Sequence, residues 1–300
     1  MVIEDIFLIN QQYIFNSGQQ RYAFKKCNNS NIELYGMELK NQLINYHHFY
    51  KIIPNRYNNI ITIVDNIKYI LLLIDNDADN RINYTDLTSQ FYTSNEDMLA
   101  TINHFPWPKF WKQKIDYMEE WFELKKEKYK NIYPWFYLFV GISENALMYV
   151  QNIEMEEKIK ECDRLCFQHN RIDRNTTKYE YYDPTTLIID HSSRDIGEYI
   201  KFSIIDETFN IEEFMEYLAR CNFSIYWLRM LYARILFPSF FFDYMEKIMN
   251  KSNDDEKNDN DEQLKFEKSI VVILENLQKI SNSLKDKYNI PIINWIIKKT

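Results

Sequence analysis

Glycine is scarce in this sequence, which has only four glycines among 300 residues. A phosphate-binding loop needs several glycines close together, because its backbone must approach the anion and adopt positive φ values. The glycines of this chain are too far apart to form a P-loop or the G-x-G-x-x-G motif of dinucleotide-binding proteins. Most nucleotide-binding fingerprints are therefore excluded. The four are Gly18, Gly36, Gly141 and Gly197.

Basic charge, cysteine and long apolar runs are also in short supply. The net charge of -8 argues against general binding of nucleic acids, whose phosphates require an excess of lysine and arginine. Four cysteines in 300 residues do not form a disulfide framework and indicate a reducing cytoplasm. The longest apolar runs, Tyr69–Ile74 and Trp135–Ile142, are too short to span a bilayer. The acidic Glu4 and Asp5 stand where a signal peptide needs basic residues, so we expect neither secretion nor a membrane partner.

The pattern of apolar residues predicts a small, strand-rich domain over residues 1–75. β-Favouring runs are separated by Asn16-Ser17-Gly18 and by Asp65-Asn66, which predicts two hairpins. A polar segment then begins, and we expect a hinge over residues 76–94. The expected elements are the strands Phe7–Phe15, Arg21–Cys27, Ile60–Val64 and Lys68–Ile74 and the helix Asn31–Tyr46.

Residues 95–300 have helical periodicity and predict a second, larger domain. A short β-like run, Leu187–Ile189, interrupts the helices, and the acidic segment 250–263 is expected to be a disordered insert. A β-rich lobe, a hinge and a helical lobe are the layout of an α+β, two-lobed fold of the protein-kinase type, which periodicity alone leaves as one of several options. The expected helices are Glu96–Phe105, Phe110–Lys130, Pro134–Gln151, Glu154–Phe167, Ile211–Arg220, Ser224–Phe237, Phe240–Asn250 and Leu264–Lys287.

Four segments carry a resemblance to a known family. The most specific is Trp227–Pro238 (WLRMLYARILFP), followed by Leu187–Ile200 (LIIDHSSRDIGEYI). Met98–Phe105 and Ile142–Val150 fall in the order that the family has. The chain thereby resembles the spore-coat CotS/YutH family, a branch of the aminoglycoside-phosphotransferase-like kinases. The resemblance implies the same kinase-like fold.

The resemblance also implies roles for individual residues. A phosphotransferase of this fold uses a lysine on the third strand, a helical glutamate that pairs with it, and a metal-binding aspartate. Lys25 resembles that lysine, Glu38 (or Glu33) the glutamate, and Asp190 the metal ligand, so these residues form a nucleotide and metal remnant. Asp195 resembles the later structural aspartate that caps a helix.

The catalytic loop departs from the family's H-G-D-x-x-x-x-N pattern. The corresponding stretch begins at His169, and Arg171 stands where the catalytic aspartate would be. A guanidinium stays protonated and cannot accept a hydroxyl proton. Asp173 lies nearby but out of register, and Thr176 replaces the asparagine. We therefore expect a pseudokinase without a catalytic residue or cofactor.

Two functions from different classes follow from these expectations. The first is a kinase-like protein that has no enzymatic activity and contacts other coat proteins as a structural or assembly component. Its expected location is the mother-cell cytoplasm, from which it assembles onto the spore coat. The alternative is an active phosphotransferase for a small molecule of the aminoglycoside or choline type. It would use ATP and magnesium with Lys25, Asp190 and Asp173, the last as base.

An acidic stretch at the hinge overlaps the loop of an EF-hand and offers a third function, a calcium-dependent interaction module. Its oxygen ligands would be Asp75, Asp77, Asp79, Asn83 and Asp86. However, an asparagine stands where the loop has its glycine, and the preceding segment is predicted to be a hairpin rather than a helix. A solvated acidic hinge is the simpler interpretation.

Two further clusters have simple structural interpretations. Cys162, Cys166 and His169 would share one face of the predicted helix and could bind zinc, but no fourth ligand is apparent. His191 and the two serines that follow it suggest a hydrolase, although no G-x-S-x-G motif surrounds them.

Arg229 and Arg234 lie on an otherwise apolar predicted helix, and we expect them to be structural. A buried arginine needs a buried acid as its partner. The candidate partners are Asp190, Asp195 and Glu198.

Overall fold

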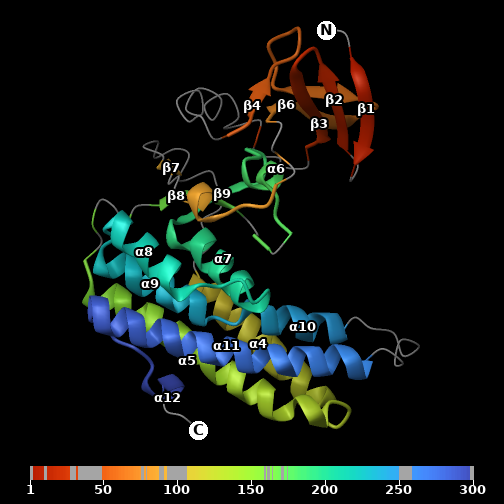
Figure 1. The fold of residues 1–300 in the computed structure, drawn as a ribbon. Coiled ribbons are helices and arrows are strands. Elements are labelled where there is room, and N and C mark those ends of the chain that lie inside the picture. Colours follow the sequence, from red (N-terminus) through yellow and green to blue (C-terminus); the bar gives the residue numbers. More distant parts are fainter. Residues whose placement is uncertain are drawn as a thin grey trace. The chain divides into compact units, whose positions relative to one another are not determined.

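The chain divides into two compact units (Figure 1). One comprises Met1–His104 and Leu165–Asp190, and the other Phe105–Arg164 and His191–Thr300. The strand-rich N-terminal region and helical C-terminal region expected from the sequence are confirmed. The lobe boundaries at residues 75 and 95 stay a prediction. The computed structural model describes residues 3–9, 12–27, 32, 49–75, 78, 80–87, 91–92, 107–158, 160, 163, 165–169, 172–173, 175–249 and 259–297.

An antiparallel sheet forms the main part of the first unit. Its order is β1-β2-β3-β6-β4, and β5 also pairs with β6. The expected strand Phe7–Phe15 is in fact the end of β1 and most of β2, which pair with each other. The strands are β1 (Glu4–Ile9), β2 (Gln12–Ser17), β3 (Gln20–Lys26), β4 (Lys51–Ile53), β5 (Ile61–Val64) and β6 (Ile67–Ile74).

Both predicted hairpins are present, and their turn residues explain why. Gly18 has φ +61° at the turn between β2 and β3. Asp65 and Asn66, between β5 and β6, have φ values of 50° and 63°. Asparagine, aspartate and glycine tolerate this left-handed region better than other residues, so the turns are encoded locally.

A row of apolar side chains crosses the sheet and forms its core. Ile52, Leu72, Ala23 and Ile14 stand opposite one another on neighbouring strands, and all four are buried. Phe7 of β1 continues this row beyond Ile14. The row defines one buried face of the sheet, and residues two positions apart along a strand share that face.

A second sheet has the order β7-β8-β9. Because Leu165–His169 is its central strand β8, the prediction of a helix over Glu154–Phe167 is wrong beyond Glu156, where the long helix α5 ends. A short apolar run can be a buried helix or strand, and here its pairing with β7 decides. The remaining elements of the first unit are β7 (Phe91–Tyr92), β9 (Leu187–His191), which reaches the unit boundary, and the short helices α2 (Tyr84–Leu87) and α6 (Lys178–Tyr181).

Helices build the second unit, with α9 at their centre. This helix packs against α5, α7 and α11, and every residue from Tyr226 to Leu236 is buried. Among the described residues, no helix is both long and apolar enough to cross a membrane. The helices are α4 (Trp107–Lys125), η1 (Lys130–Ile132), α5 (Tyr133–Glu156), α7 (Ser193–Ile205), α8 (Ile211–Cys221), α9 (Ile225–Leu236), α10 (Ser239–Met249), α11 (Asp259–Tyr288) and α12 (Asn294–Ile297).

Three predicted segments have other outcomes. The composition of the acidic segment 250–263 predicts disorder, but its last five residues, 259–263, are the start of α11. Helices can extend through acidic residues near their N-terminus because the helix dipole favours them there. Two predicted helices lie outside the described residues, Glu96–Phe105 entirely and Asn31–Tyr46 except for Ile32.

Two helical glycines of the second unit form a matched pair for testing its packing. A Cβ atom at Gly197 of α7 would lie 2.6 Å from Cγ and 3.0 Å from Cβ of Arg234, whereas one at Gly141 of α5 would have nothing within 4 Å. We expect Gly197→Ala to destabilise the protein by about 1–3 kcal/mol through overpacking. Gly141→Ala should stabilise it by about 0.5–1 kcal/mol, because alanine loses less backbone entropy. Urea unfolding measures both, and equal effects would contradict the close approach of α7 and α9.

Candidate functional site

Lys25 lies on the central strand β3 and belongs to the buried face of the sheet. It stands opposite Gln12 of β2 and Ile70 of β6, two positions after Ala23. Its ammonium forms an ion pair with the carboxylate of Asp183, and the two side chains are only 13% and 2% exposed. The charge of this lysine is therefore neutralised by a partner 158 residues away in the chain.

Asp183 is held in place by its own hydrogen bonds. One carboxylate oxygen, Oδ1, accepts from the amide (2.8 Å) and the hydroxyl (2.7 Å) of Thr185. The other, Oδ2, contacts Lys25. Both oxygens are thus occupied, which is the condition under which a buried carboxylate is tolerated.

A tyrosine-rich segment, residues 177–183, brings Asp183 beneath the sheet. Its backbone amides at Lys178 and Tyr179 donate to the carbonyls of Asn80 (2.7 Å) and Ala78 (2.8 Å). Thr177 begins α6 as part of a capping box with the glutamate three residues later. These bonds fasten the segment to the predicted hinge, so its position is fixed by backbone as well as side-chain contacts.

Two tyrosines of this segment pack against Tyr50, and one of them reaches the cross-strand neighbour of Lys25. The ring of Tyr179 is stacked 6.0 Å from that of Tyr50, and its hydroxyl donates to Gln12. Burial raises the pKa of Tyr179, and the negative charge of Asp183 adds to the effect, so the hydroxyl stays a donor. Tyr182 lies edge-on to Tyr50 at 6.1 Å. Tyr179 thus contacts the residue that pairs with Lys25 across the sheet.

The remnant of a catalytic loop is bonded locally. His169 ends β8, and its ring stacks on Tyr181 at 4.2 Å while Nε2 contacts the Tyr181 carbonyl. Asp173 accepts a hydrogen bond from the amide of Asn175 (2.8 Å), as in a turn. Arg171 lies outside the described residues.

The other residues implied by the kinase resemblance are distributed as follows. Asp190 lies on β9 and is 1% exposed, and Asp195 lies in the first turn of α7 and is 3% exposed. Neither Glu38 nor Glu33 is among the described residues. The partner of Lys25 that the structure identifies is therefore Asp183, which the sequence did not suggest.

Asp86, the last residue of the acidic stretch at the hinge, has a structural role. Asp86 accepts from the Tyr182 hydroxyl (2.6 Å) and from the Asn83 amide (2.8 Å), and its own amide donates to Asn83 (3.4 Å). This reciprocal pattern caps α2 and leaves Asp86 7% exposed. Asp75 is exposed, and Asp77 and Asp79 lie outside the described residues. Within the part of the chain that is described, no group of three or more acidic, histidine or cysteine side chains could hold a metal ion.

The cysteine and serine clusters also have structural environments. Cys166 and His169 lie on strand β8, three positions apart, so they point to opposite faces rather than sharing a helix face as expected. Cys162 is outside the described residues. The Ser193 hydroxyl lies 2.7 Å from Nδ1 of His191, but Ser193 is 0% exposed at the start of α7 and no substrate can reach it.

The two arginines of α9 are themselves buried and pair with acids, Arg234 with a buried one and Arg229 with two that are more exposed. Nε of Arg234 lies 2.7 Å from Glu198, one of the partners expected from the sequence. Nη1 and Nη2 of Arg229 are each 2.8 Å from Glu157 and Glu156 respectively, which were not among the expected partners. Both guanidinium groups therefore connect α9 to a neighbouring helix or its end.

Glu198 is shared between two cations. Lys201 contacts it at 2.9 Å in addition to Arg234. Burial alone would raise the pKa of Glu198, but attraction by Lys201 and Arg234 outweighs it and lowers the pKa to about 2. Burial lowers the pKa of Lys201 to about 8, because desolvation and repulsion by Arg234 exceed the attraction of Glu198.

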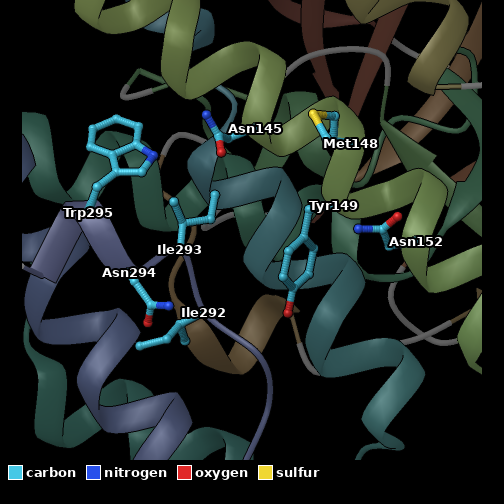
Figure 2. A pocket seen from close by; sticks show the side chains of 8 residues that line it. All are labelled: Asn145, Met148, Tyr149, Asn152, Ile292, Ile293, Asn294 and Trp295. Carbon is cyan, nitrogen blue, oxygen red and sulfur yellow. The ribbon is translucent and has the colours of Figure 1, made fainter.

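A separate pocket of about 440 Å³ lies between α5 and the C-terminal segment of the second unit (Figure 2). It contains none of the site residues predicted from the sequence. The hydroxyl of Tyr149 donates to the Pro291 carbonyl at 2.6 Å and so joins the two walls. The lining residues are Asn145, Met148, Tyr149, Asn152, Ile292, Ile293, Asn294 and Trp295.

Comparison with known proteins places this geometry in context. A family model described as "Spore coat putative kinase YutH" matches residues 1–279. The endospore coat-associated protein YutH of Bacillus subtilis (strain 168) is 28% identical over 209 residues, 64% of this chain and 61% of the relative. The chain thus matches less than two thirds of that relative's length.

Solved structures show the fold. An aminoglycoside phosphotransferase from Alicyclobacillus acidocaldarius has a TM-score of 0.61 at 12% identity, with 93% of each chain covered. The AMP-bound complex of a spectinomycin phosphotransferase has a TM-score of 0.55 at 10% identity, covering 90% of this chain and 93% of that one. The expected fold of the protein-kinase type is therefore confirmed.

The Lys25–Asp183 pair predicts a strong energetic coupling. We expect Asp183→Asn to destabilise the protein by about 3–5 kcal/mol, because it leaves a buried ammonium without a countercharge. Adding Lys25→Met should recover much of this loss, since no unpaired charge then remains. A double-mutant cycle from urea unfolding measures the coupling. If the two substitutions are additive, the ion pair is absent in solution.

The Glu198 cluster predicts a dependence of stability on pH. The pKa of Glu198 is about 2 in the folded state and lies near 4.5 without the cluster. The unfolded chain therefore binds the proton first as pH falls. The stability that ionised Glu198 contributes is fully present above about pH 4.5. It decreases towards pH 2, with a slope of up to about 1.4 kcal/mol per pH unit. Glu198→Gln should be less stable at pH 7 and have a shallower slope, measured by urea unfolding between pH 3 and 7. An unchanged slope would show that Glu198 does not titrate as described.

Proposed function

The chain belongs to the YutH family of kinase-like spore-coat proteins, and from this premise we propose that it acts in the coat without transferring phosphate. Its role is that of a folded component that contacts other coat proteins. It would be made in the mother-cell cytoplasm and assemble onto the forming coat. The name of the Bacillus subtilis relative, an endospore coat-associated protein, supports this location.

The ion pair between Lys25 and Asp183 is the observation that carries the proposal. In active kinases a lysine on the third strand holds the phosphates of the nucleotide. A nucleotide would have to displace Asp183 from Lys25 and bring its own negative charge into a buried site. Tyr179, which is stacked with Tyr50, contacts Gln12 opposite Lys25 on the neighbouring strand.

The catalytic side of the site supports the same conclusion. Arg171 cannot act as a base, and the carboxylate of Asp173 accepts a hydrogen bond from the turn that follows it. Losing a general base typically costs 10²–10⁴-fold in rate. Arg171 in the sequence and the turn-bonded Asp173 in the structure thus both support a protein that does not transfer phosphate from ATP.

An active small-molecule phosphotransferase is the second candidate. The observation in its favour is the fold, which it shares with a spectinomycin phosphotransferase whose structure contains AMP. Activity would require Asp183 to release Lys25 and Asp173 to leave its turn. Once Asp183 released Lys25, Glu38 would have to replace it as the partner of the lysine.

Nucleotide binding separates the two candidates. We expect no rise in the melting temperature with ATP and magnesium up to millimolar concentration, because Lys25 is neutralised within the chain. A ligand that binds only the folded state would stabilise it by about 2.7 kcal/mol at a concentration one hundred times its Kd. Differential scanning fluorimetry measures the shift.

Two variants serve as controls for this measurement. Any shift that persists in Lys25→Met arises outside the proposed remnant, and Lys51→Met removes an exposed lysine of the same sheet. A shift that depends on magnesium, saturates, and disappears in Lys25→Met but not in Lys51→Met would overturn the proposal in favour of the phosphotransferase.

A further inference from the structure

Strand β1 lies at an edge of the main sheet (Figure 1), and its apolar side chains at Ile6, Phe7 and Leu8 are exposed. Among the described strands it pairs with β2 alone. Three consecutive residues are more than half exposed: Ile6 at 60%, Phe7 at 58% and Leu8 at 65%. Edge strands of native proteins are normally protected by lysine, proline or a covering element, because their backbone groups can pair with another chain.

Apolar side chains are exposed on both faces of β1. Phe7 stands opposite Ile14 and therefore continues the buried row that runs across the sheet. Leu8 stands opposite Tyr13 on the other face, and Tyr13 is itself 42% exposed. The apolar core of the sheet thus reaches its edge and ends there in contact with solvent.

Protection is confined to the first half of the strand. Glu4 and Asp5 carry the only charges of β1, and the register shifts between Glu4 and Phe7, with φ of 51° at Asp5. A bulge and acidic side chains are devices that discourage pairing. From Phe7 onward the register is regular and the strand carries no charge.

We propose that a second copy of this chain covers β1, by antiparallel pairing of the two β1 strands about a two-fold axis at Phe7. Phe7 then faces Phe7 of the partner subunit, and Ile6 faces Leu8 of the partner subunit. The apolar row continues from one sheet into the other. The two-fold closes after one contact, so a dimer forms rather than a filament.

The charges of β1 favour this arrangement over others. In a parallel pair, Glu4 and Asp5 would lie beside the same acids of the second strand, and like charges opposite each other destabilise a sheet. In the antiparallel pair they lie at opposite ends. A second copy also presents the same uncharged apolar stretch, so one contact pairs the exposed backbone groups of both edges. Because each chain carries a net charge of -8, salt should strengthen the dimer rather than weaken it.

Sedimentation velocity of the full chain tests the dimer, with lysine introduced at two exposed apolar positions. Phe7→Lys, on β1, should give a folded monomer, since exposed substitutions change the stability of the subunit itself by only about 0.5 kcal/mol. Ile63→Lys is the matched control, because Ile63 is 65% exposed on β5, which pairs with the opposite edge of β6. It should remain a dimer. A wild-type monomer at every concentration, or a dimer that only Ile63→Lys disrupts, would overturn the proposal.

Cysteine pairing tests the register. Two cysteines form a disulfide when their Cβ atoms can approach to about 3.5–4.5 Å. Directly opposite residues of an antiparallel pair, at about 4.5–5.5 Å, come much nearer to this than diagonal ones at about 7–8 Å. Under mild oxidation Phe7→Cys should form a covalent dimer, whereas Leu8→Cys alone should not, and a mixture of Ile6→Cys and Leu8→Cys chains should link to each other. Equal linking by Phe7→Cys and Leu8→Cys would contradict the two-fold at Phe7. If β1 binds a strand of another protein instead, no variant links to itself.

This inference deepens the proposed function by identifying one protein contact of the assembly role. The two can fail separately. If the protein is a monomer and shows no ATP-dependent shift, the dimer proposal is wrong and the proposed absence of phosphotransfer stands. If it is a dimer and binds ATP and magnesium through Lys25, the proposed function is wrong and the strand pairing stands.

Discussion

Burying a lysine costs free energy unless a carboxylate lies against it, and much of the first unit depends on how Lys25 meets this constraint. Asp183 supplies the carboxylate and is itself oriented by Thr185. The segment that carries Asp183 is fastened to the carbonyls of Ala78 and Asn80. One ion pair therefore joins the sheet, the predicted hinge and the connection between β8 and β9.

The same constraint bears on function. A sheet lysine in a kinase is useful because its charge is available to a phosphate. When the chain supplies its own anion, a phosphate must compete with a carboxylate for the lysine, and this competition is the basis of the function proposed above. The stacked rings of Tyr50 and Tyr179 add apolar contacts within the same unit.

Features encoded by neighbouring residues could be predicted from the sequence. The hairpins follow from Gly18 and from Asp65-Asn66, whose backbone conformation few other residues adopt. The amphipathic helices of the second unit follow from their periodicity. The predicted start of one of them, Ser224, is the N-cap of α9, whose first helical residue is Ile225. Lys25 is assigned through a family resemblance rather than through periodicity.

Features that depend on distant contacts could not be predicted. The sequence of β8 predicts a helix because a short apolar run has the same composition in either state, and the pairing partner β7 is far away in sequence. Asp183 escapes prediction because its partner is 158 residues away. The run of tyrosines at 179, 181 and 182 within a polar stretch is the available signal, since tyrosines gather where a chain is packed. Helix α7 is not predicted, because its two buried acids, its buried lysine and its buried serines interrupt the apolar pattern of its inner face.

The separation of Lys25 from Asp183 has a consequence for synthesis on the ribosome. Residues 1–104 of the first unit are made first, yet residues 165–190 of the same unit emerge only after most of α4 and α5. At about 5–20 residues per second, the 158 residues between lysine and aspartate take roughly 10 to 30 s to be made. During that interval the hairpins can form, but Lys25 has no Asp183 to pair with. The nascent lobe is therefore incomplete until the chain is nearly two thirds made, and a chaperone that shields apolar surface would act in this window.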